Sequence, residues 1–85
     1  MKKLVADAEG HEIKMGDIVV LRTLPPELIA GLPTEDVRAI ASQVGQRMAV
    51  VGFDQYGNVE LDFESSDGTL HTIFVSGIQL RKEIS

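Results

Sequence analysis

The sequence contains no cysteine and no tryptophan. The absence of cysteine excludes disulfide bonds, thiolate catalysis and every metal site that uses cysteine ligands. The chain has only 85 residues, and a domain of this size buries only about two-thirds of the surface that its unfolded chain exposes. A small domain without covalent or metal cross-links is viable if it closes into a compact barrel or dimerises.

Lysine and arginine are missing between Arg47 and Arg81. The same stretch carries carboxylates at Asp54, Glu60, Asp62, Glu64 and Asp67. A surface of this charge repels phosphate backbones, and the whole chain has a net charge of −5. Nucleic-acid binding is therefore disfavoured, but it stays open as an alternative because many small barrels serve that function.

Long apolar runs are also absent. Only Leu4-Val5-Ala6 separates Lys2 and Lys3 from the first acidic residue, and this run is too short for the core of a signal peptide. No other segment approaches the roughly 20 apolar residues of a membrane-spanning helix. We therefore expect a soluble, cytoplasmic protein without a membrane partner.

The clearest element is Asn58–Glu64, in which apolar residues alternate with carboxylates. This period of two is typical of a half-buried strand. Glycine-containing turns flank it, and further strand-like runs lie beyond the turns at Gln46–Phe53 and Thr69–Val75. We predict a three-stranded meander over about residues 46–75, with Asn58–Glu64 in the middle.

Two further elements precede the meander. Ile18–Thr23 is rich in β-branched residues and lies between a Gly-Asp turn and two prolines, so it is expected to form a strand. A helix is predicted over about residues 34–45, because Thr34 can cap it, acidic residues follow in the first turn and Gly45 can end it. Its apolar stripe consists of Val37, Ile40, Ala41 and Val44. A single helical turn is expected between the two elements, at Glu27–Ala30.

These elements resemble a known fold family. Gly16–Leu21 is similar to the opening strand of Src-homology-3-like (SH3-like) small barrels, Gly57–Leu61 to a middle strand, and Ser76–Leu80 to the single turn and last strand. Val5–Val19 also resembles the start of the PhnA-like barrel domain of bacterial phosphonate-operon proteins. The resemblance implies a mainly β fold: an SH3-like small five-stranded barrel, with one short helix inserted after the first long strand. It carries over no function and no site residues. The length of the chain allows one domain, residues 1–85.

Residues that could catalyse a reaction or bind a metal form no recognisable constellation. The two histidines, His11 and His71, lie in different segments, whereas a zinc site needs at least three suitable ligands. No serine stands in a nucleophile elbow, and no glycine-rich phosphate loop is present. We expect no enzyme, cofactor or metal, and a small metal-binding or enzymatic domain remains a further alternative.

The acidic face of the central strand allows two interpretations. It could attract a cation or a basic partner, or it could be the solvated outer face of a barrel. We favour the second, because carboxylates two residues apart on a strand lie about 7 Å from one another.

Aromatic residues are few, at Phe53, Tyr56, Phe63 and Phe74. Phe63 and one of Phe53 or Phe74 are expected in the core, which leaves Tyr56 in a turn. A proline-peptide groove or a methyl-lysine cage needs several exposed aromatic rings in a cluster, so neither is favoured.

The best functional prediction concerns the connection from Leu24 to Leu32. It combines large apolar side chains with prolines, and such side chains on a loop need cover. The connection could plug the barrel end, or it could bind an unknown protein partner or a second copy in a homodimer. The candidate partner-binding residues are Leu24, Pro25, Pro26, Leu28, Ile29 and Leu32. We accordingly predict a non-catalytic protein-interaction or accessory module.

Overall fold

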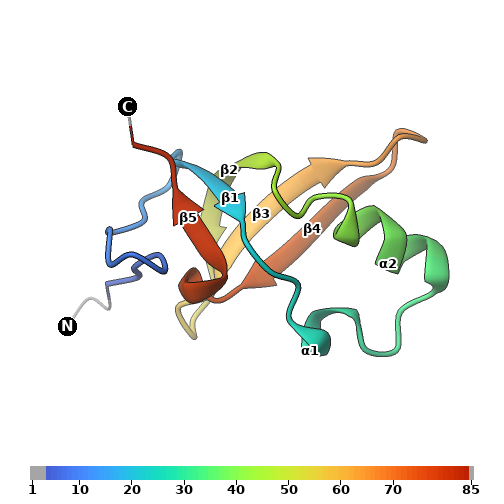
Figure 1. Ribbon diagram of the computed structural model, residues 1–85, viewed down its shortest axis with the longest axis horizontal. Helices are drawn as coiled ribbons and strands as arrows, with labels where there is room; N and C mark the ends of the chain where they lie inside the picture. The colour runs from blue at the N-terminus through green and yellow to red at the C-terminus, as the bar shows by residue number, and fades with distance from the viewer. Residues whose placement is uncertain (1–3, 85) are drawn as a thin grey trace.

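A computed structural model describes residues 4–84, so Lys2 and Lys3 lie outside the described residues. Five antiparallel strands form one sheet in the order β4-β3-β2-β1-β5 (Figure 1). The strands are β1 (Ile18–Leu21), β2 (Arg47–Phe53), β3 (Val59–Glu64), β4 (Leu70–Val75) and β5 (Leu80–Lys82). The helices are α1 (Pro26–Ile29), α2 (Thr34–Ala41) and the 3-10 turn η1 (Gly77–Gln79). The predicted mainly β fold and the three-stranded meander are confirmed.

β2 belongs to both halves of the sheet. Its first part pairs with β1 and its second part with β3, and the register shifts between Val50 and Gly52. An extra residue at such a bulge bends a strand and increases its twist. β4 and β5 are the two edges, and within residues 4–84 no pairing joins them. The sheet is therefore open, and closure into a barrel is not shown.

The alternation predicted for the central strand is confirmed. Val59, Leu61 and Phe63 are buried, whereas the carboxylates between them are half-buried or exposed. The other strands add to the same core, and burying each large apolar side chain contributes about 1.5–3 kcal/mol. The core consists of Ile13, Val19, Leu21, Ile40, Met48, Val50, Val59, Leu61, Phe63, Ile73, Val75 and Leu80.

The prediction that Phe53 or Phe74 joins this core is wrong. Phe53 is 38% exposed and Phe74 is 44% exposed. Phe74 lies opposite Glu60 in the β3–β4 ladder, so it shares the outer face with the carboxylates. Phe53 is the last residue of β2, at the end of the sheet.

α2 ends at Ala41, four residues before the predicted end at Gly45. The chain leaves the helix there because Val44 bridges to Leu21 and the Gly45 amide donates to the Leu21 carbonyl at 2.8 Å. Pro33 takes the N-cap position in place of Thr34. The buried side of the helix is narrower than predicted, with Ile40 as its one buried residue. None of the helices in the described part of the chain could span a membrane.

Candidate functional site

The connection predicted to bind a partner lies largely against the domain itself. Its half-buried residues, which pack against the core, are Leu24, Leu28 and Ile29, and Pro25 is buried. Pro26 is exposed, and Leu32 is 40% exposed. Much of the apolar surface that suggested a docking site is therefore covered, and partner binding here stays a prediction that depends on Pro26 and Leu32.

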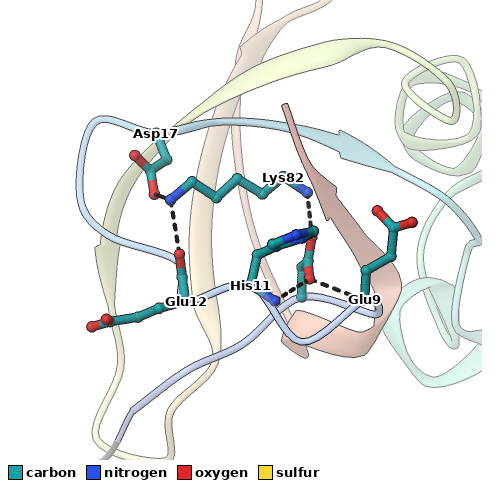
Figure 2. A network of polar contacts seen from close by, with 6 residues as sticks. Glu9, His11, Glu12, Asp17 and Lys82 are labelled. Atoms are coloured by element: carbon teal, nitrogen blue, oxygen red, sulfur yellow. Dashed lines mark hydrogen bonds and ion pairs between the residues drawn. The ribbon is translucent and has the colours of Figure 1, made fainter. Parts of the chain in front are cut away.

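A polar centre that is not among the predictions made from the sequence joins the first segment of the chain, residues 4–17, to the last strand, β5 (Figure 2). The Asp7 side chain is inaccessible to solvent, with 0% exposure. Its Oδ1 accepts hydrogen bonds from the amides of Glu9 (2.9 Å) and His11 (2.8 Å), and its Oδ2 accepts one from the Lys82 amide (2.7 Å). One carboxylate therefore organises a turn and also fixes that turn to β5.

The surroundings of Asp7 keep it ionised. Burial acts to raise its pKa, but the hydrogen bonds from the amides of Lys82, His11 and Glu9 and from the His11 ring together lower the pKa to about 2. Nδ1 of His11 lies 3.4 Å from Oδ2 of Asp7.

The Lys82 side chain strengthens the same connection. Its Nζ lies 3.1 Å from Oδ2 of Asp17 and donates to the Glu12 carbonyl at 3.0 Å. The Lys14 amide, which donates to the Asp17 carboxylate, and the Lys82 ammonium both lower the pKa of Asp17. Asp7 and Lys82 thus act as a clasp between the two ends of the chain.

Asp7, Glu9 and His11 could each offer one metal-ligand atom, and these atoms lie within 4.8 Å of one another. However, both oxygens of Asp7 already accept hydrogen bonds from backbone amides. We therefore assign Asp7 a structural role.

An acidic cleft of about 470 Å³ lies between α2 and the turn end of the β3–β4 hairpin. Its volume falls in the range of ligand-binding clefts, about 300–1,000 Å³. The carboxylates that line it are Glu35 and Asp36 on α2, Glu64 at the end of β3 and Asp67 in the turn. Arg38 contributes a guanidinium to the same lining, so the carboxylates outnumber the positively charged groups.

Two local features fix the hairpin side of this cleft. The Ser65 hydroxyl donates to Asp67 at 2.5 Å and the Thr69 amide donates to it at 3.0 Å. These bonds lower the pKa of Asp67 to about 2, the hydroxyl of Ser65 having the largest effect. His71 is half-buried and stacks on Phe63, with ring centroids 4.9 Å apart.

β4 is the edge strand beside this cleft. The Ser65 amide donates to the Thr69 carbonyl at the start of the hairpin. Hydrogen-bonded pairs alternate with non-bonded pairs along an antiparallel ladder, so His71, Ile73 and Val75 exchange backbone bonds with β3. The amides and carbonyls of the alternate residues, Leu70, Thr72 and Phe74, therefore point away from β3. Within residues 4–84 no strand pairs with β4 on that side.

The outer face of β4 carries exposed apolar side chains. Leu70 is 68% exposed and lies opposite Glu64, while Phe74 lies opposite Glu60. The smaller Thr72 stands between them and donates its hydroxyl to Asp62 at 2.7 Å. On this face, the apolar side chains of β4 therefore lie directly beside the carboxylates of β3.

A second, more apolar groove of about 610 Å³ lies between the first segment and the β2–β3 turn. Its lining includes Leu4, Met15 and Phe53, of which Met15 is 69% exposed. Met15 in this groove therefore provides an exposed apolar residue away from β4, suited to a matched control substitution.

The sequence held a signal for the Asp7 clasp. The pattern Asp-x-x-Gly occurs at Asp7–Gly10 and again at Asp54–Gly57. In both turns the aspartate Oδ1 accepts the amides two and four residues further on. The bond from Asp7 to the distant Lys82 could not be read from this local pattern, because it depends on the tertiary arrangement.

Comparisons of the chain with protein-family models, with curated proteins and with solved structures gave no match.

Proposed function

We propose that this protein is a non-catalytic interaction module that binds another protein on the β4 side of its sheet. The observation that carries the proposal is the exposure of Leu70 and Phe74 on an edge strand without lysine, glutamate or proline. Those residue types commonly protect exposed edges from pairing with other chains. Covering apolar surface stabilises a complex by about 25 cal/mol for each Å² buried, so this surface favours association.

We also propose that the fold is SH3-like. Two features support this assignment: the strand order β4-β3-β2-β1-β5 and the single helical turn, η1, directly before the last strand. The connection between β1 and β2 is enlarged by α1 and α2, of which α1 contacts both β4 and α2 (Figure 1).

Three matched substitutions locate the binding surface. Leu70→Lys, Met15→Lys and Leu32→Lys each place one charge on an exposed apolar residue, on the β4 side, the second groove and the predicted connection respectively. We expect Leu70→Lys to weaken retention of a protein partner at least about tenfold, because central apolar contacts contribute about 2 kcal/mol or more. The other two should retain it unchanged.

The measurement is affinity capture from the source cell with the full chain as bait, followed by titration of each captured protein with the three variants. Circular dichroism checks that each variant is folded. Loss of binding with Leu32→Lys alone would transfer the function to the connection Leu24–Leu32. The absence of any protein whose retention depends on one of the three residues would contradict the proposed function.

A further inference from the structure

We propose that the partner segment is an extended peptide of alternating basic and apolar residues, which pairs with β4 as a sixth strand and enters the acidic cleft. This inference rests on the proposed function and names the chemistry of the partner. It combines two observations that are independent of one another: the open backbone groups of β4 and the charge of the cleft.

The backbone of β4 supplies the pairing. Leu70, Thr72 and Phe74 direct their amides and carbonyls away from β3, as the phase of the hairpin ladder requires. An added strand lies about 4.8 Å from its neighbour and bonds to such a row of groups. These main-chain bonds provide affinity without reading the peptide sequence.

Side chains of the added strand alternate between two different environments. On one side, at the Thr69–His71 end of β4, they face the cleft and α2, where Glu35 and Asp36 favour lysine or arginine. On the other side they lie next to Leu70 and Phe74, where apolar side chains remove exposed surface from water. The period of two in a strand therefore selects a peptide in which basic and apolar residues alternate.

A second copy of this chain fits the edge less well. The β4 strand of a second copy has no lysine or arginine, because none occurs between Arg47 and Arg81. Pairing two β4 edges would also bring two acidic clefts together, and like charges repel. Charge complementarity therefore selects a foreign, basic segment.

The test uses the blocked hexapeptide Lys-Val-Lys-Val-Lys-Val, titrated into the full chain at low salt and followed by backbone amide NMR shifts. The composition-matched control is Lys-Lys-Lys-Val-Val-Val. We expect the alternating peptide to bind at least about tenfold more tightly and to shift the amides of Leu70, Thr72 and Phe74. N-methylation of alternate peptide amides in the register that pairs with β4 should abolish binding, because it removes the donors that pairing requires.

Protein variants separate backbone pairing from charge. Thr72→Pro removes an outward-facing amide, a position where an edge strand tolerates proline, and should weaken binding at least about tenfold. Thr72→Val keeps the amide and should bind normally. Glu35→Gln combined with Asp36→Asn should weaken binding severalfold and reduce its salt dependence, whereas Glu9→Gln, remote from the cleft, should have no effect.

Several outcomes would overturn the inference. These are no binding of the alternating peptide, equal binding of both peptides, insensitivity to N-methylation, or a dimer of the chain that Thr72→Pro converts to a monomer. If Thr72→Pro fails to fold, the N-methylated peptide still decides. A cellular partner that Leu70→Lys releases would leave the proposed function standing even if the peptide failed, so the two failures can be distinguished.

Discussion

Replacing Gly77 with alanine is expected to destabilise the protein by about 3 kcal/mol, the upper part of the usual range for overpacking. A Cβ atom at this position would lie 2.1 Å from the Ala6 carbonyl oxygen and 3.0 Å from its carbon. The obstacle is backbone, which cannot rotate away like a side chain. The Ala8 amide, bonded to the Leu80 carbonyl at 3.0 Å, and the Asp7 clasp both resist its movement.

Gly52→Ala is the matched control. Gly52 is also buried, and neither glycine has a positive φ. Its added Cβ would meet only Oε1 of Glu60, at 3.3 Å, and this side-chain end can move aside. Urea unfolding of both variants measures the difference. A loss below about 1 kcal/mol is expected for Gly52→Ala, and a similar small loss for Gly77→Ala would show that the first segment does not pack on η1 as described.

Asp7→Asn is expected to destabilise the protein by about 2–3 kcal/mol, because it leaves a buried donor unpaired and replaces bonds to a charged acceptor. The asparagine oxygen can still accept the amides of Glu9 and His11, but its NH₂ group would face the Lys82 amide. Two donors would then oppose each other where a carboxylate oxygen now accepts. The free energy of unfolding from urea titration at pH 7 gives the effect.

Asp54→Asn is the control that distinguishes the contribution of the turn to stability from that of the bond to Lys82. Asp54 makes the same bonds to the amides two and four residues on, and its side chain also binds that of Asn58, within the same turn. The loss of stability should be smaller than for Asp7→Asn, because no bond to a distant segment is broken. Equal losses would mean that the Lys82 bond does not contribute.

The dependence of stability on acid pH tests the Asp7 clasp independently. The pKa of Asp7 is about 2 in the folded protein and near the ordinary 3.8 in the unfolded chain. A depressed pKa stabilises the fold fully above the unfolded value, and that stability is lost as the pH falls through the folded value. The wild type should therefore lose more stability than Asp7→Asn between about pH 4 and pH 2. Parallel pH profiles for the two proteins would contradict the assignment.

The local elements of this fold could be predicted, but some of their relations could not. Alternation in Asn58–Glu64 determined which face is buried, because a strand places successive side chains on opposite sides. Composition did not reveal that Phe74 would stand among carboxylates, since its register against Glu60 depends on the turn between the strands. Likewise the helix ends early at Ala41 because Val44 finds a tertiary partner in Leu21.

The candidate site was less accessible to prediction. The sequence marked Leu24–Leu32 as the docking surface because its apolar residues stand in a loop, and the structure places three of them against the core. The acidic stretch was expected to be a solvated face. The acidic cleft forms only when α2 lies beside the hairpin, because Glu35 and Asp36 are then brought together with Glu64 and Asp67.

Amide hydrogen exchange along β4 tests the central claim most directly, because the proposed binding mode requires an open edge. In the isolated protein, the amides of Leu70, Thr72 and Phe74 should exchange rapidly, while those of His71, Ile73 and Val75 should be protected by their bonds to β3. Addition of the alternating Lys-Val peptide should slow exchange of the first three amides at least about tenfold. The protection of the other three should stay unchanged. Protection of all six amides in the isolated protein, or no change on addition of the peptide, would contradict the account.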